Sequence, residues 1–179
     1  MALTLLRHTM PAIASGVCYG MTDLDVADSF AQEAADVLAA LPRPDRIITS
    51  PLKRCCLLAE HVGASLDLPV TIDDRLCEMD FGTWEGHPWA EIPRAELDLW
   101  AEDFLHARPH GGESVAILTT RVRAALAEWH DHQGHALIVT HAGVIKAALA
   151  TEATAQGYNT TIGFGRFVTL SHPSRGTSA

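Results

Sequence analysis

The chain has 179 residues, a mass of 19.3 kDa and 47% hydrophobic residues. This length suits one globular domain and is short for two. A formal net charge of −9 argues against nonspecific binding to nucleic acids or anionic membranes, because both require a cationic surface that displaces counterions. No stretch reaches the length of a membrane span, and the short apolar opening does not resemble a signal peptide. We therefore expect a cytoplasmic protein.

The first apolar run, from Leu3 to Leu6, predicts a strand buried on both faces, although a buried helix can show the same pattern. The run ends at Arg7 and His8. A cation and an imidazole at the rim of a core must be solvated or paired. Since open parallel sheets bind ligands beyond the carboxyl ends of their strands, Arg7 and His8 are candidate site residues.

Two segments follow this strand before the next apolar run. Residues 11–25 contain two glycines with turn chemistry, Gly16 and Gly20, so we expect a loop that walls the pocket beside His8. Apolar residues then recur at helical spacing from Phe30 to Leu41, and the prolines beyond Leu41 end the predicted helix.

The second and third strands are predicted over residues 45–49 and 70–72. Ser50 precedes a proline, which indicates a helix N-cap followed by proline in the first turn. Arg54 would then lie about one turn inside the helix, close to the same rim as His8.

The region after the third strand is the least regular. It begins with Glu78, and residues 82–112 form an excursion interrupted by prolines, which we expect to cover the site. A short helix is predicted near Ala90 to Leu99. Trp84 and Trp89 are interpreted as packing residues of this excursion.

The last part of the chain returns to regular patterns. A helix is predicted from Glu113 onward, with apolar residues along one face. A strand over residues 136–139 stops just before His141, a helix follows over about 142–150, and Arg166 to Ser171 forms a final strand candidate.

Strands that alternate with helices predict the fold class α/β, as a three-layer α/β/α single domain with a mainly parallel sheet. We expect this domain to span residues 1–172 and residues 173–179 to form a tail. In such a sheet the carboxyl ends of parallel strands meet at one edge, so His8, Arg54 and His141 should converge there.

Five ordered motifs across nearly the whole chain resemble the histidine phosphatase superfamily, in its phosphoglycerate mutase-like branch, and are most like α-ribazole phosphatase. They are Leu6–Thr9, Thr49–Arg54, Leu76–Gly86, Gly111–Ser114 and Val139–Gly143. The sequence departs from the usual pattern at Thr9, where a glycine is usual, and at Ala14, where many members have an asparagine. We expect these two departures to affect substrate preference.

The resemblance implies that His8 is the nucleophile, that Glu78 is the general acid and base, and that Arg7, Arg54 and His141 hold the phosphoryl oxygens. It also implies substrate contacts from the following residues: Arg7, Thr9, Ser15, Tyr19, Arg54, His141 and Ala142. This chemistry suits the residue types, because guanidiniums bind phosphoryl oxygens bidentately and a neutral imidazole is a competent nucleophile. No metal or other cofactor is required. Glu113 is interpreted as a capping or structural carboxylate.

The expected activity is therefore metal-independent hydrolysis of a phosphomonoester through a phosphohistidine, with α-ribazole-5'-phosphate as the candidate substrate. The expected partner is a small phosphorylated metabolite, with no nucleic acid and no membrane, and the oligomeric state stays open. One alternative is a phosphoglycerate mutase, for which the excursion looks too short. A noncatalytic phospho-ligand binder is the other, and it would not need Glu78.

Overall fold

A computed structural model describes residues 2–171 of the chain, so the predicted tail and the predicted end of the domain at residue 172 lie outside the described residues. The order of strands in its single described sheet is β3-β2-β4-β1-β5. The strands are β1 (Ala2–Arg7), β2 (Arg46–Thr49), β3 (Val70–Ile72), β4 (His135–Thr140) and β5 (Phe167–Ser171). All neighbours pair in parallel except β5, which runs antiparallel to β1. The prediction of a mainly parallel sheet is confirmed.

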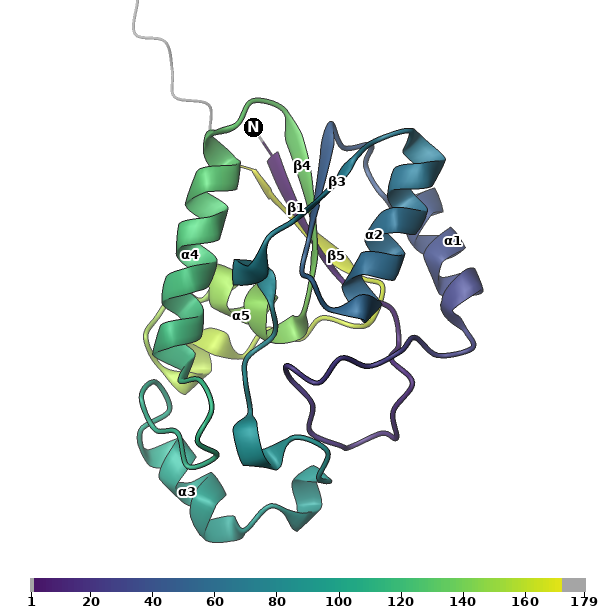
Figure 1. Ribbon diagram of the computed structural model, residues 1–179. Helices are drawn as coiled ribbons and strands as arrows, with labels where there is room; N and C mark the ends of the chain where they lie inside the picture. Colours follow the sequence, from purple (N-terminus) through teal and green to yellow (C-terminus); the bar gives the residue numbers. More distant parts are fainter. Residues whose placement is uncertain (1, 172–179) are drawn as a thin grey trace, which may run out of the picture.

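Helices cover both faces of this sheet. They are α1 (Phe30–Ala40), α2 (Lys53–Leu66), α3 (Arg94–Glu102), α4 (Val115–Asp131) and α5 (Ala142–Leu149). Figure 1 shows α1 and α2 on one face, α4 and α5 on the other, and α3 beyond the end of the sheet. The three-layer α/β/α architecture is therefore confirmed, and the described chain forms a single α/β domain.

The central strand β4 shows why its sequence is apolar without interruption. Ala136 and Ile138 belong to the core under α4 and α5, whereas Leu137 and Val139 belong to the core under α1 and α2. Successive side chains of a strand point to opposite faces, so a strand covered on both sides needs apolar residues at every position. The two cores therefore fix the position of β4, and His141 is the residue that directly follows this strand.

Two predicted helix starts are wrong. The helix expected from Ala90 begins instead at Arg94, because Pro93 fixes its entry and a separate 3-10 turn occupies Trp89–Glu91. The helix expected to begin right after Ser50 begins at Lys53, with Leu52 at the N-cap and no side-chain cap. Arg54 therefore lies within the first turn of α2.

The excursion between Gly82 and Gly112 packs against the loop of residues 11–25. The Cys18 amide donates to the His87 carbonyl over 2.8 Å, and the Trp89 amide donates to the Gly16 carbonyl over 2.9 Å. Trp84 is buried against Cys18, which confirms its interpretation as a packing residue. The two segments together form one structure beyond the carboxyl end of the sheet (Figure 1).

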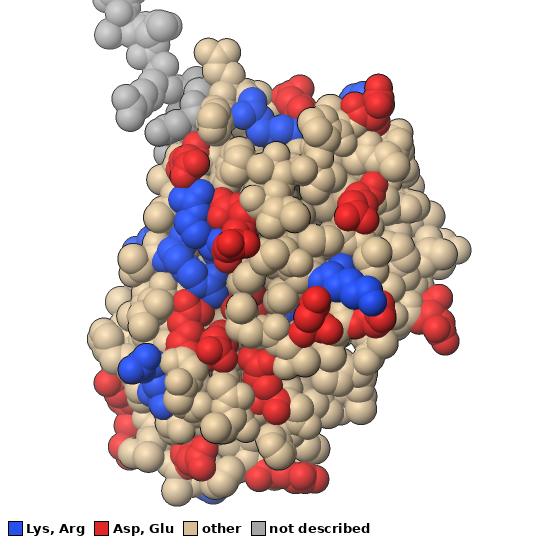
Figure 2. All heavy atoms as spheres, in the orientation of Figure 1, with Lys and Arg blue, Asp and Glu red and all other residues tan. Residues whose placement is uncertain are grey.

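The surface agrees with the acidic composition. Figure 2 shows acidic side chains spread over the displayed face, from the helices to the excursion, with basic side chains among them. Within residues 2–171, none of the helices is both long enough and apolar enough to cross a membrane.

Candidate active site

The carboxyl ends of three adjacent strands meet at one place. In the sheet register Arg7 lies opposite Thr140, and Thr49 lies opposite Val139. His8 directly follows β1, and His141 directly follows β4. Their ring centroids are 5.2 Å apart, and the angle between the ring planes is 62°. The structure thus brings together two imidazoles that are far apart in sequence.

His8 is 1% exposed, and its ring orientation is fixed by the backbone. The Nδ1 atom lies 2.6 Å from the Thr9 carbonyl oxygen. A carbonyl only accepts, so Nδ1 carries the proton and Nε2 keeps its lone pair. Burial is the main cause that lowers the pKa of His8 to about 3, with a contribution from the Arg54 and Arg7 guanidiniums and an opposing one from the Thr9 carbonyl. His8 is therefore a neutral imidazole at physiological pH.

Arg54 is completely buried beside His8. Its Nη1 donates to the Thr22 carbonyl over 2.8 Å, and its Nη2 donates to the Gly20 carbonyl over 2.7 Å. The loop of residues 11–25 therefore orients the guanidinium from one side. Its Nε atom is buried and has no hydrogen-bond partner within the described chain.

Arg7 directly precedes His8, and its guanidinium is held in a similar way. Its Nη1 donates to the Ile162 carbonyl over 2.6 Å, and its guanidinium carbon lies 3.8 Å from the Phe164 ring centroid. The Arg7 Nε and the Thr9 hydroxyl are both buried without a partner among residues 2–171. Buried donors in protein interiors are nearly always satisfied, so unpaired donors on both residues next to His8 suit an anion-binding site.

His141 is also fully buried. Its Nε2 lies 2.7 Å from the Ser50 hydroxyl, which also accepts the Leu52 amide at 3.3 Å. Burial holds the pKa of His141 well below its usual range, and the His8 and Arg54 groups lower it further. Ser50, predicted as a helix cap, thus contacts the second imidazole instead.

Glu78 is 8% exposed and is oriented by two backbone amides. Its carboxylate accepts from the Met79 amide at 2.9 Å and from the Gly143 amide at 3.0 Å. A Cβ atom at position 143 would overlap the Glu78 Oε1 atom, so this close approach requires glycine. Glu78 also lines a cavity of about 340 Å³ together with Ala142.

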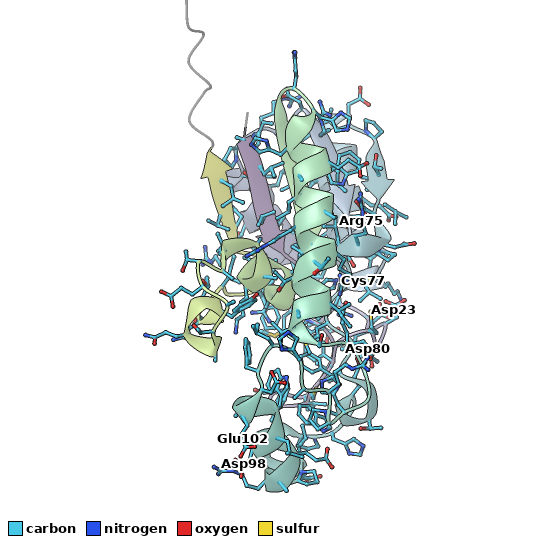
Figure 3. All side chains as sticks on the ribbon, turned by 90° about the vertical axis from the view of Figure 1, so that its left-hand side faces the viewer. Asp23, Arg75, Cys77, Asp80, Asp98 and Glu102 are labelled. Atoms are coloured by element: carbon cyan, nitrogen blue, oxygen red, sulfur yellow. The ribbon has the colours of Figure 1, made fainter. Side chains whose placement is uncertain are left out.

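The segment that carries Glu78 is held by an arginine that the sequence did not single out. Arg121 of α4 donates to the backbone carbonyls of Arg75 and Cys77 at 2.7 Å and of Glu78 at 3.0 Å. Its Nε and Nη2 atoms donate to both carboxylate oxygens of Glu113, at 2.7 and 2.8 Å. Figure 3 shows Arg75, Cys77 and Asp80 following one another beside α4. In the sequence, the sign of this role is that Arg121 lies at the edge of the apolar face of the predicted helix.

The other predicted substrate contacts divide into two groups. Thr9 and Ala142 lie beside the imidazoles, and the Tyr19 ring centroid lies 5.3 Å from the Arg54 guanidinium carbon. Burial raises the pKa of the Tyr19 phenol, and the nearby Arg7 and Arg54 oppose that effect. Ser15 is exposed in the loop and makes no hydrogen bond to the described residues, so the structure does not tie it to the site.

This geometry defines an α/β protein with a neutral, buried imidazole near two arginines at the carboxyl edge of its sheet. The family model described as the histidine phosphatase superfamily (branch 1) matches residues 3–161. The chain belongs to this superfamily.

Several relatives are named as phosphatases. Glucosyl-3-phosphoglycerate phosphatase of Mycolicibacterium vanbaalenii is 33% identical over 83% of this chain and 72% of its own length. Adenosylcobalamin/alpha-ribazole phosphatase of Escherichia coli is 32% identical over 59% of this chain and 55% of its own length. The native structure of mycobacterial glucosyl-3-phosphoglycerate phosphatase aligns with a TM-score of 0.83 and 28% identity, covering 97% of this chain and 91% of that one. The chain is therefore a phosphatase of this superfamily.

Proposed function

We propose that this phosphatase hydrolyses phosphomonoesters without a metal, through a phosphohistidine formed at Nε2 of His8. The observation that carries the proposal is the 2.6 Å contact between His8 Nδ1 and the Thr9 carbonyl oxygen, which requires the proton of the neutral imidazole to be on Nδ1. The unprotonated Nε2 is left as the nucleophile, with Arg7 and Arg54 as permanent cations beside it.

The proposed reaction has two displacements at phosphorus. In the first, the His8 Nε2 lone pair forms the N–P bond while the P–O bond to the alcohol breaks, and protonated Glu78 gives its proton to the leaving oxygen. In the second, the Glu78 carboxylate takes a proton from water as the water oxygen attacks phosphorus and the N–P bond breaks. Arg7, Arg54 and His141 stabilise the equatorial oxygens in both steps.

The finer substrate assignment is also a proposal. The sequence motifs favour α-ribazole-5'-phosphate, and the Escherichia coli relative carries a related name. The Mycolicibacterium vanbaalenii relative, which matches more of the chain, instead names glucosyl-3-phosphoglycerate. Both compounds are therefore candidate substrates, and comparing their kcat/KM values distinguishes them. Measuring the isomerisation of 3-phosphoglycerate beside its hydrolysis tests the mutase alternative. A cytoplasmic location remains a prediction.

The central experiment follows phosphate release from p-nitrophenyl phosphate in the presence of EDTA. The wild-type protein should hydrolyse this substrate with EDTA present. The kcat of His8→Ala should be lower by about 10⁴-fold or more, as expected for removal of a nucleophile. Brief incubation with ³²P-labelled substrate and an alkaline quench should label the wild-type protein with an acid-labile phosphate, and His8→Ala should not be labelled. His87→Ala, at an exposed position of the excursion, is the matched control. Full activity of His8→Ala, or loss of wild-type activity with EDTA, would overturn the proposal.

A further inference from the structure

A cavity adjoins the phosphoryl site on the side of Glu78. It has a volume of about 340 Å³ and lies between α3, α4, α5 and a 3-10 turn, η4 (Ala155–Tyr158). Glu78, Ala142 and Gly143 belong to its lining, and Ala142 directly follows His141 in the chain. Since Glu78 is the proposed proton donor to the departing oxygen, the alcohol portion of the substrate must lie within reach of this carboxyl group.

One side of the cavity is aromatic. Trp100 and Phe104 belong to its lining, and their ring centroids are 5.7 Å apart. Tyr158 adds a third ring, 5.4 Å from Phe104, and its hydroxyl is already bonded to Thr119 at 2.8 Å. Such a surface packs against the apolar face of a ligand and leaves few groups to bind its polar atoms.

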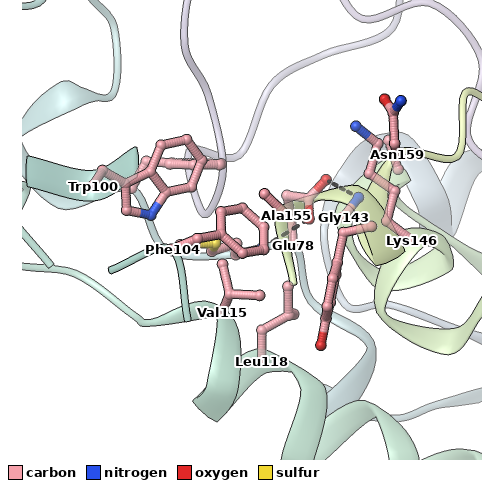
Figure 4. A pocket seen from close by; sticks show the side chains of 13 residues that line it. Glu78, Trp100, Phe104, Val115, Leu118, Gly143, Lys146, Ala155 and Asn159 are labelled. Carbon is pink, nitrogen blue, oxygen red and sulfur yellow. Dashed lines mark hydrogen bonds between the residues drawn. The ribbon is translucent and has the colours of Figure 1, made fainter. Parts of the chain in front are cut away.

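The cavity also contains a single cation that the protein does not neutralise. Lys146, one turn into α5, is the only lysine or arginine among the described residues of the lining. It has no ion pair or hydrogen bond with any described residue, and the Glu78 oxygens are bonded to backbone amides. Figure 4 shows the Lys146 amine and the Asn159 amide on one side of Glu78 and the rings of Trp100 and Phe104 on the other.

We propose that this cavity binds the alcohol portion of the substrate, and that Lys146 pairs with a carboxylate on that alcohol. The inference rests on the proposed hydrolysis and specifies its substrate class: phosphate esters of hydroxy acids whose apolar face contacts Trp100 and Phe104. A lysine in a partly enclosed apolar cavity interacts strongly with an anion because little water screens the pair. Lys146 is thus a specificity-determining residue, and it takes no part in the chemical steps.

The test compares two esters that differ mainly in one group. In 3-phosphoglycerate a carboxylate stands where glycerol 3-phosphate has a neutral hydroxymethyl group. The ratio of their kcat/KM values should favour the acid in the wild-type protein. We expect this ratio to fall about tenfold in Lys146→Met, mainly through KM, and to fall further in Lys146→Glu. Arg123→Met, which removes an exposed charge of the same sign from α4, should leave the ratio unchanged.

The outcomes separate this inference from the proposed function. A wild-type ratio near one, or equal ratios in the wild-type protein and Lys146→Met, would overturn the role of Lys146 while hydrolysis itself stands. An equal drop in Arg123→Met would also overturn it, because the effect would then come from the overall charge. Absence of phosphate release from both esters and from p-nitrophenyl phosphate would instead reject the proposed hydrolysis.

Discussion

The two halves of the site are built in different ways. The proposed phosphate-binding half consists of His8, Arg54 and His141. These residues lie at or just beyond the ends of three adjacent parallel strands and are almost entirely buried. The proposed alcohol-binding half consists of Glu78 and the cavity beside it, whose lining comes from segments widely separated in the chain. The first half is fixed by the sheet, whereas the second depends on individual tertiary contacts.

This difference predicts different consequences of substitution. Groups that hold the phosphoryl oxygens act on every substrate equally, because every substrate carries the same phosphoryl group. Groups that position Glu78 matter most when the leaving alcohol is a poor leaving group, since a stable leaving group such as p-nitrophenolate departs without a proton. Comparing alkyl phosphates with p-nitrophenyl phosphate therefore separates the two halves experimentally.

The largest effect is expected in the phosphate-binding half. Arg54→Met removes a buried guanidinium next to His8, and we expect kcat to fall about 10³-fold. The loss should be the same within a factor of about three for alkyl and aryl substrates, because the phosphoryl group is common to both. Steady-state kinetics with glycerol 3-phosphate and p-nitrophenyl phosphate measure it. A loss confined to one substrate would show that Arg54 acts on the alcohol instead.

The next effect belongs to the alcohol-binding half. In Gly143→Ala the new methyl group would overlap Glu78 Oε1, so the carboxyl group must move away from its two amide donors. We expect about a 10²-fold loss of kcat with alkyl phosphates and a much smaller loss with p-nitrophenyl phosphate. Equal losses with both substrates would mean that the methyl group disturbs the phosphate-binding half as well.

A smaller effect of the same kind is expected from Arg121→Met. The substitution removes the donors to the Glu78 backbone and leaves the Glu113 carboxylate without its partner. We expect kcat with alkyl phosphates to fall about tenfold relative to p-nitrophenyl phosphate. Stability should also fall, by about 3 kcal/mol in urea unfolding.

The control for this substitution is Arg75→Met. The Arg75 side chain pairs with Asp73 and Glu128 and does not touch Glu78. It should lower stability without changing the ratio of alkyl to aryl activity. If Arg75→Met changes that ratio as much as Arg121→Met does, the kinetic effect reflects general loosening of the segment.

The contrast between the two halves also explains what the sequence could predict. The positions of His8 and His141 followed from apolar runs that end abruptly, because a strand buried on both faces leaves a simple pattern. No comparable pattern predicted the contacts of Arg121, because three of its acceptors are backbone carbonyls, which any sequence would supply. Ser50 was misassigned because a serine before a proline suits both a helix cap and a turn, and only the tertiary contact with His141 distinguishes them.

The excursion shows the same limit. The sequence predicted one short helix near Ala90 to Leu99, but the chain forms a 3-10 turn, passes through Pro93 and only then begins α3. The cavity beside Glu78 could not be predicted, because its lining combines residues of α3, α4, α5 and η4 that share no periodic signal. Its single cation, Lys146, looks like an ordinary helix residue in the sequence.

The smallest expected effect concerns stability and returns to the phosphate-binding half. The pKa of His8 is about 3 in the folded protein, below the ordinary value of 6.5 that applies to the unfolded chain. Between these values the unfolded chain binds a proton that the folded protein does not, so the free energy of unfolding rises with pH. The contribution of His8 is complete above the unfolded pKa and is lost as pH falls toward the folded one.

Replacing His8 by asparagine removes this proton uptake while keeping a neutral polar side chain of similar size. Between about pH 5 and pH 6, the slope of unfolding free energy against pH should decrease by about 1 kcal/mol per pH unit relative to the wild-type protein. Urea unfolding at several pH values measures both slopes. His141, whose pKa is also lowered by burial, should give a similar decrease in His141→Asn. Unchanged slopes in both variants would mean that the folded protein takes up these protons, and that the phosphate-binding half is far more open to water than its burial indicates.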